Sequence, residues 1–402
     1  MDKRFVYLDN NATTKVDEKV LEEMLPYFSE NYANPGGMYD FAGKMNKKLK
    51  DAREAVKELF GADSQEEILI TASGSESANT AIRGVVYSTP GQKHIITTKV
   101  EHPCVLNTYA ALEKLGHKVS YLGVDSHGNL DLNELEELIK PETTLVSIMA
   151  ANNETGILFP FEKIAEIVKE KNPDTKVFVD AVQGAGKIKL DFKNTKVDLA
   201  SVSGHKFHAP KGIGALYIKK GTKILPLITG GHQERGLRAG TENTAGIIGM
   251  GKAAELAVSS LNDELTRVKY LRDKLENSLL KNIFNARLNS SVGNRVPNTT
   301  NIGFEYIEGE LILLYMNEAG ICASSGSACT SGSLDASHVL KAMGVPFTSL
   351  HGSVRFSLSR FTTEDEIDYT CKVMPDIINK INTLSPFQKE LKELKSIKHF
   401  DE

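Results

Sequence analysis

The sequence predicts an α/β protein with two domains. From about residue 67 to 220, short runs rich in Val, Ile, Thr and Tyr alternate with helical stretches, which is typical of a mainly parallel sheet covered by helices on both faces. After residue 251, a long helical stretch leads to shorter strands and helices, as in a smaller α+β domain. A chain of 402 residues, 41% of them hydrophobic, is long enough to build both.

Seven apolar runs are the predicted strands of the sheet. In chain order they cover residues 68–72, 94–100, 118–124, 144–151, 176–179, 199–202 and 213–218. Helices are expected between them, for example over 132–139 and 161–171, and a long one over 252–282. A charged helical tail is expected at 385–402, and the Ser- and Gly-rich run at about 323–335 is expected to be a mobile loop.

Composition excludes several classes of partner. With 48 Lys+Arg against 52 Asp+Glu, the net charge of -4 gives no overall field that would favour nucleic acid or an anionic membrane surface. Every apolar run is shorter than the roughly 20 residues that cross a bilayer, and the first residues lead into no signal-peptide core. We therefore expect a cytoplasmic protein that acts on a small molecule.

The four cysteines show neither the spacing of a zinc site nor the density of a disulfide framework. We interpret all four as free thiols and expect no metal. Cys104, Cys322 and Cys371 lie beside apolar or strand-like positions and are expected to be small core residues. Cys329 differs, because it lies in the Ser- and Gly-rich run.

Polar residues follow the predicted strands at the edge where an open α/β sheet binds ligands. They are Ser73 to Ser77, His102, Asn153, Asp180 with Gln183, and Lys206. Each has an ordinary alternative: a helix cap at 73–77, a core histidine at 102, a turn at 153, a helix cap at 180 and a surface lysine at 206.

Taken together, these residues match what pyridoxal 5′-phosphate (PLP) requires of a protein. Lys206 would supply the amine that holds the cofactor, with Phe207, His205 and His208 as the apolar and cationic neighbours that lower a lysine pKa. Asp180 would take the pyridine nitrogen and keep it protonated. His102 would cover the ring and Gln183 would reach the ring oxygen. The turn at 73–77, which opens a helix, would hold the phosphate.

The chain also resembles the class V aminotransferases and, among them, the cysteine desulfurases of the NifS/IscS type. The resemblance runs nearly end to end and rests on seven ordered motifs: YLDNNATT at 7–14, EH at 101–102, NNETG at 152–156, VDA at 179–181, SGHK at 203–206, RGLRAGT at 235–241 and SGSACTS at 325–331.

This resemblance implies the aspartate aminotransferase-like fold (fold type I), with a large PLP-binding domain at 16–258 and a small domain made of 1–15 and 259–402. It implies a homodimer. It further implies that the phosphate is held by five residues and that Asn153 contributes to cofactor binding; the five are Gly74, Ser75, Ser203, His205 and, from the neighbouring subunit, Thr241.

Cys329 distinguishes a desulfurase from an ordinary aminotransferase, because taking sulfur from cysteine needs a soft nucleophile to receive it. The alternative is an exposed structural cysteine in a linker. Arg355, on the alternating run 353–357, would bind the substrate carboxylate bidentately with help from Asn153. The alternative for Arg355 is a surface ion pair.

We therefore expect a cysteine desulfurase that converts L-cysteine into L-alanine and a Cys329 persulfide, with Lys206 moving the Cα proton and His102 shuttling protons. The expected sulfur acceptor is an iron–sulfur scaffold protein of the IscU/NifU type; a tRNA-thiolation relay and a nitrogenase-specific partner are the alternatives. The alternatives are a selenocysteine lyase, a class V aminotransferase or a non-catalytic sulfur-relay scaffold. Two segments depart from the family pattern, Gly74-Ser75 and Gly37-Met38-Tyr39. Where relatives usually have Thr, Ser75 keeps a side-chain hydroxyl.

Overall fold

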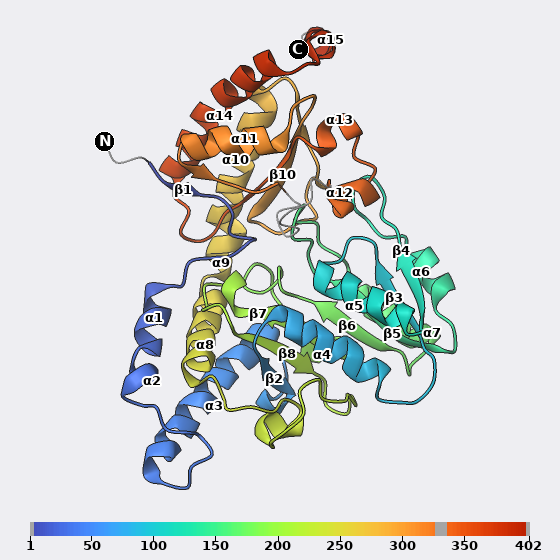
Figure 1. Ribbon diagram of the computed structural model, residues 1–402, viewed down its shortest axis with the longest axis vertical. Coiled ribbons are helices and arrows are strands. Elements are labelled where there is room, and N and C mark those ends of the chain that lie inside the picture. The colour runs from blue at the N-terminus through green and yellow to red at the C-terminus, as the bar shows by residue number, and fades with distance from the viewer. Residues whose placement is uncertain (1–3, 326–335, 399–402) are drawn as a thin grey trace.

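The computed structural model describes residues 4–325 and 336–398. A seven-stranded sheet lies in the lower body of the molecule in Figure 1. Its order is β2-β8-β7-β6-β5-β3-β4, and only β8 runs against its neighbours. The predicted mainly parallel seven-stranded sheet is confirmed. Its strands are β2 Ile68–Thr71, β3 His94–Thr98, β4 Lys118–Leu122, β5 Thr143–Met149, β6 Lys176–Asp180, β7 Leu199–Ser203 and β8 Gly214–Ile218.

The sheet is buried on both faces, as in parallel sheets generally, and apolar side chains of its central strands point to either side. On β6, Val177 and Val179 pack into the core on one face, while Phe178 packs into the core on the other. The first face is covered by α3 Asp40–Phe60, α6 Leu132–Leu138, α7 Phe161–Lys171 and α8 Thr244–Ser259, and the second by α4 Gly74–Val86 and α5 Pro103–Lys114. Helices α1 Glu18–Met24 and α2 Pro26–Ser29 pack beside α8.

The predicted long helical stretch over 252–282 is helical in the structure, but it is divided into several helices, of which the first begins at Thr244. Helix α8 ends at Ser259, and the chain continues through α9 Leu261–Asp263, a π-helical turn Glu264–Val268 (η5) and α10 Lys269–Asn282. The hydroxyl of Ser260 donates to the carbonyl of Leu256 at 2.8 Å, so this side chain competes with the backbone where α8 ends. The π-helical turn brings Glu264 into the interior.

The upper body in Figure 1 has its own apolar core around a three-stranded antiparallel sheet of order β12-β10-β9. These strands are β9 Ala286–Leu288, β10 Thr299–Phe304 and β12 Ser353–Ser357. The helices of this part are α10, α11 Gly309–Glu318, α12 His338–Ala342, α13 Phe347–Leu350, α14 Glu364–Leu384 and α15 Gln388–Lys398. Short 3₁₀ turns lie at η1 Gln65–Glu67, η2 Phe192–Asn194, η3 Gly204–Lys206 and η4 Gln233–Gly236.

The N-terminal segment links the two bodies. Strand β1 Val6–Tyr7 pairs in parallel with β11 Ile321–Cys322, after which the backbone N–H of Asn10 donates to the carbonyl of Ser357 at 3.1 Å. Four residues further on, the N–H of Thr14 donates to the carbonyl of His205 at 3.0 Å. Residues 9–14 therefore touch both β12 and the end of β7. Among the described helices, none is long and apolar enough to cross a membrane.

Candidate active site

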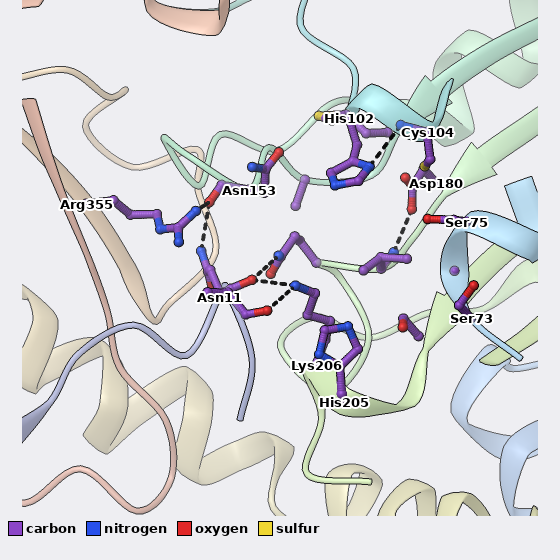
Figure 2. A pocket seen from close by; sticks show the side chains of 17 residues that line it. Asn11, Ser73, Ser75, His102, Cys104, Asn153, Asp180, His205, Lys206 and Arg355 are labelled. Atoms are coloured by element: carbon purple, nitrogen blue, oxygen red, sulfur yellow. Dashed lines mark hydrogen bonds between the residues drawn. The ribbon is translucent and has the colours of Figure 1, made fainter. Parts of the chain in front are cut away.

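A cavity of about 270 Å³ opens where the parallel strands end (Figure 2). Asp180 and Ser203 are the last residues of β6 and β7, and Lys206 closes the short turn η3 that follows β7. This is the edge at which the sequence places a ligand site. Ten of the predicted site residues line the cavity: Gly74, Ser75, His102, Asn153, Asp180, Gln183, Ser203, His205, Lys206 and Arg355.

The N-terminus of α4 forms one wall. Ser73 is its N-cap, and the Ser73 hydroxyl accepts a hydrogen bond from the N–H of Glu76 at 3.1 Å. A Cβ atom at Gly74 would lie 3.0 Å from Cγ2 of Val182 and 3.2 Å from Cβ of Ser203, so glycine lets the helix come close to the strand ends. With its free N–H groups and positive dipole end beside two serine hydroxyls, this wall suits a phosphate.

Asp180 is fully buried beside this wall. Its Oδ1 accepts from the N–H of Val182 at 3.1 Å and from the hydroxyl of Ser201 at 3.3 Å. Burial raises the pKa of Asp180, while nearby His102 and Lys206 act in the opposite direction and favour the carboxylate. An interior carboxylate of this kind suits a cationic nitrogen.

His102 is held by the helix that it caps. The N–H of Cys104, in the first turn of α5, donates to Nδ1 of His102 at 3.2 Å. Burial lowers the pKa of His102, and the charge of Asp180 raises it. Since Nδ1 accepts a hydrogen bond, the proton of the neutral ring lies on Nε2.

Glu101 fixes the ends of the two strands that flank His102. Its Oε1 accepts from the hydroxyl of Thr98 at 2.9 Å and from the N–H of Met149 at 3.0 Å, which joins β3 to β5. Burial, together with the charge of Asp180, raises the pKa of Glu101 to about 8.

Lys206 points into the cavity from η3 (Figure 2). Its Nζ donates to the carbonyl oxygens of Asn11 and Ala12, both at 2.7 Å. The neighbouring His205 ring bonds the hydroxyl of Thr13 at 3.0 Å, and burial with the charge of Lys206 lowers the pKa of His205 to about 4. A neutral His205 and an amine held by carbonyls thus lie side by side at the cavity floor.

Arg355 enters from the upper body. Only 2% of this residue is exposed. The alternative prediction, a surface ion pair, is therefore wrong. Its Nη2 nevertheless pairs with Oδ1 of Asp9 at 2.7 Å, and its Nη1 donates to the carbonyl of Asn153 at 3.1 Å. That carbonyl also accepts from Nδ2 of Asn11 at 3.1 Å.

The two remaining predicted site residues are Thr241 and Cys329. Thr241 is exposed and does not line it. Cys329, with most of the segment expected to be a mobile loop, lies outside the described residues. The described chain on either side is fixed to the cavity walls: Ser324 exchanges backbone hydrogen bonds with Arg355, and the hydroxyl of Ser337 donates to Oε2 of buried Glu154 at 2.5 Å.

The structure adds wall residues that the sequence reasoning missed, chiefly Asn11, Cys104 and Met149. Asn11 belongs to a polar run directly after the first apolar strand, which is the signal that could have found it. Cys104 packs against the core only in part and lines the cavity, and burial raises the pKa of its thiol well above the ordinary value. The described residues contain no cluster of three or more His, Cys, Asp or Glu that could hold a metal ion.

The donor set fits PLP: a helix N-terminus with hydroxyls for the phosphate, a buried carboxylate for the nitrogen, a histidine beside it and a lysine amine. Fold and cavity together define an α/β enzyme of the fold type I class. The sequence profile described as aminotransferase class-V matches residues 6–370.

Known proteins of similar sequence agree. The chain is 54% identical to a cysteine desulfurase of Nostoc sp. over 96% of either chain, and 50% identical to the cysteine desulfurase NifS of Azotobacter vinelandii, with 95% of this chain and 94% of that one covered. A solved structure named a NifS-like protein superposes with a TM-score of 0.88 at 42% identity, covering 94% of this chain and 100% of the other. The chain belongs to the class V aminotransferase family and, within it, to the cysteine desulfurases of the NifS/IscS type.

Proposed function

We propose that this protein is a PLP-dependent cysteine desulfurase, which takes sulfur from L-cysteine and leaves L-alanine with a persulfide on Cys329. The observation that carries the proposal is the meeting of Lys206, Asp180 and His102 with the N-terminus of α4 in one cavity. Family membership supports the choice of substrate.

Within this proposal, Lys206 holds PLP, Asp180 pairs with its nitrogen and His102 covers its ring. Gln183 donates to the ring oxygen, with Asn153 beside it. The phosphate is held by Gly74, Ser75, Ser203, His205 and, from a second subunit of a homodimer, Thr241. When bound, PLP supplies an electron sink that weakens the bonds at the substrate Cα.

The chain's own groups carry out the rest of the reaction. Arg355 binds the substrate carboxylate, assisted by Asn153, and the Lys206 amine carries the proton at Cα. The Cys329 thiolate attacks the substrate sulfur: an S–S bond forms, the C–S bond breaks, and the carbon takes up a proton to give alanine. His102, with its proton on Nε2, carries protons beside the reacting atoms.

We further propose a cytoplasmic homodimer with a large domain at 16–258 and a small domain made of 1–15 and 259–402. The persulfide is passed to an iron–sulfur scaffold protein of the IscU/NifU type, and neither nucleic acid nor a membrane is a partner. The net charge of -4 and the absence of a membrane-crossing helix among the described residues support the last point.

The test is alanine release from L-cysteine in the presence of a reductant that clears the persulfide. Wild type, Cys329→Ala and the matched control Cys371→Ala are compared; Cys371 lies on α14 and does not line the cavity. Alanine from wild type and control but not from Cys329→Ala supports the proposal.

Two other results would contradict it. Equal alanine from all three proteins would reject Cys329 as sulfur acceptor and favour a lyase acting on cysteine or selenocysteine. No alanine from any of them, with amino-group transfer to an oxo acid instead, would identify an aminotransferase; without either activity a non-catalytic scaffold would be indicated.

A further inference from the structure

A second, smaller polar cavity lies behind the cavity floor. Its volume is about 20 Å³, enough for one water molecule, and Lys206 lines both cavities. Lys187, Glu264 and Arg360 also line the smaller one. Lys187 and Glu264 are each 6% exposed, and buried charges of this kind are costly unless they are paired and hydrogen-bonded.

Lys187 is joined to the active-site wall through Gln183. Its Nζ donates to Oε1 of Gln183 at 2.9 Å, and Nε2 of Gln183 donates to the carbonyl of Asn11 at 3.1 Å. An ammonium has donors only and a backbone carbonyl accepts only. If the amide of Gln183 were turned over, an NH₂ group would face the ammonium and two carbonyl oxygens would face each other, so both partners fix the same orientation.

This orientation leaves one N–H of Gln183 unused by Lys187 and Asn11, because the amide nitrogen carries two hydrogens. Gln183 itself lines the larger cavity. At this point of the wall, Gln183 can therefore offer a hydrogen-bond donor, which suits a ligand atom that accepts a hydrogen bond.

The contact with Lys187 fixes this orientation only while Lys187 is charged, since a neutral amine has a lone pair that could accept from a turned amide. Burial lowers the pKa of Lys187, Glu264 raises it, and Lys206 and Arg355 lower it further. Glu264 is thus the countercharge among the groups that act on Lys187.

Glu264 is the first residue of the π-helical turn, and its side chain is buried. Burial raises the pKa of Glu264, while Lys187, Arg360 and a hydrogen bond from the Arg360 backbone lower it and Asp263 raises it. Its Oε2 is buried and has no hydrogen-bond partner among the described residues, although the carboxylate borders a cavity with room for a bridging water. The π-helical turn, which interrupts the predicted long helical stretch, thus places the carboxylate of Glu264 beside the smaller cavity.

We propose that Lys187, with Glu264 as its countercharge beside the smaller cavity, is a positioning residue that fixes Gln183 as a hydrogen-bond donor to the ring oxygen of PLP. The inference rests on the proposed function, because it needs PLP in the larger cavity. A donor at this place stabilises the deprotonated ring oxygen, and an amide turned the other way would oppose it.

The experiment measures the visible absorbance of the PLP-loaded protein as a function of pH, with thermal unfolding recorded for every variant. Lys187→Met keeps the length of the side chain and removes its charge; the pH of the absorbance transition is expected to rise by about one unit. Lys187→Arg, which restores a cationic donor, is expected to return it toward wild type, and Glu264→Gln to raise it in the same direction as Lys187→Met.

The matched control is Lys169→Met. Lys169 is a largely buried lysine on α7 that pairs with Asp198 at 2.7 Å and does not line the active-site cavity, so its loss is expected to leave the transition unchanged. Should Lys187→Met fail to fold, Glu264→Gln decides, because it preserves shape while removing the countercharge.

A transition at the same pH in wild type, Lys187→Met and Glu264→Gln would overturn the inference while leaving the proposed function intact. A wild-type protein that takes up no PLP would overturn the proposed function instead, so the two failures are distinguishable. The double variant Lys187→Met/Gln183→Leu is expected to shift no further than Gln183→Leu alone, since both changes remove the same donor. Additive shifts would contradict the proposal that Lys187 acts by orienting Gln183.

Discussion

Asp9 and Arg355 form an ion pair of 2.7 Å between segments 346 residues apart in the chain. Asp9 follows β1, whereas Arg355 is the central residue of β12, and the guanidinium also donates to the carbonyl of Asn153. Two partners thus set its plane in the cavity wall, while its buried Nε has no partner among the described residues. A guanidinium held in this way is prepared for a bidentate carboxylate.

Replacing Arg355 by Ala is expected to raise KM for L-cysteine on the order of 10- to 100-fold, with a smaller change in kcat, because uniform binding of the substrate carboxylate is lost. Steady-state kinetics of alanine release measure this. Arg287→Ala, at a half-exposed arginine paired with Glu305 at 3.9 Å, is the control. An unchanged KM in Arg355→Ala would refute the carboxylate role.

Loss of the Lys206 amine is expected to abolish covalent retention of PLP. Lys206→Ala protein mixed with PLP and passed through a desalting column should lose the visible absorbance that the wild type keeps, because no other lysine lines the cavity among the described residues. Lys211→Ala, an exposed neighbour, is the control. Absorbance that persists in Lys206→Ala would reject Lys206 as the attachment point.

Asp180→Asn is expected to lower kcat on the order of 100-fold or more while leaving thermal stability unchanged or slightly higher. The amide matches the shape of the carboxylate but carries no charge to hold a protonated nitrogen, so kcat falls. Because the substitution also removes a buried charge, the stability is not expected to fall. Alanine release and a thermal melt provide the two readouts. A kcat within tenfold of wild type would contradict the assigned role.

His208 is expected to make stability fall in acid. Burial, with Arg360 nearby, lowers the pKa of His208 to about 3, and its Nδ1 donates to the carbonyl of Lys15 at 3.0 Å. Between the unfolded value near 6.5 and about 3, the unfolded chain binds a proton that the native chain does not, so the stability present above pH 6.5 is lost as pH falls. The loss amounts to about 1.4 kcal/mol per pH unit within that window.

Urea unfolding at pH values from 7 down to 5 tests this. His208→Asn should flatten the slope, and asparagine suits the left-handed backbone at this position, where φ is 70°. The control is His127→Asn, at an exposed histidine. Equal slopes in wild type and His208→Asn would assign the acid loss to other groups.

The sequence was sufficient to predict the sheet and most of the cavity lining. Strand runs are strongly apolar, and the rule that ligands meet the carboxyl ends of parallel strands needs no knowledge of side-chain positions. His102, Asp180 and Lys206 each follow a separate strand, yet the register of the sheet brings them to one cavity.

What the sequence did not predict depends on long-range packing. The pairing of Asp9 with Arg355 and the carbonyl contacts of Asn11 need the N-terminal segment to lie between two bodies. The break after Ser259 depends on local hydrogen bonding and on the burial of Glu264, neither of which periodicity reports. The domain limits stay a prediction, and so does the role of Cys329.

The position of residues 9–14 has a consequence for biosynthesis. These residues are synthesised well before their partners His205 and, later still, Arg355 and Ser357. Lys206 lies 194 residues after the Ala12 carbonyl that it meets, and Arg355 lies 346 residues after the carboxylate of Asp9. Contacts of such large sequence separation form slowly. The nascent protein therefore has to complete its sheet before it can acquire a working site, and cofactor uptake is expected to follow the synthesis of β12.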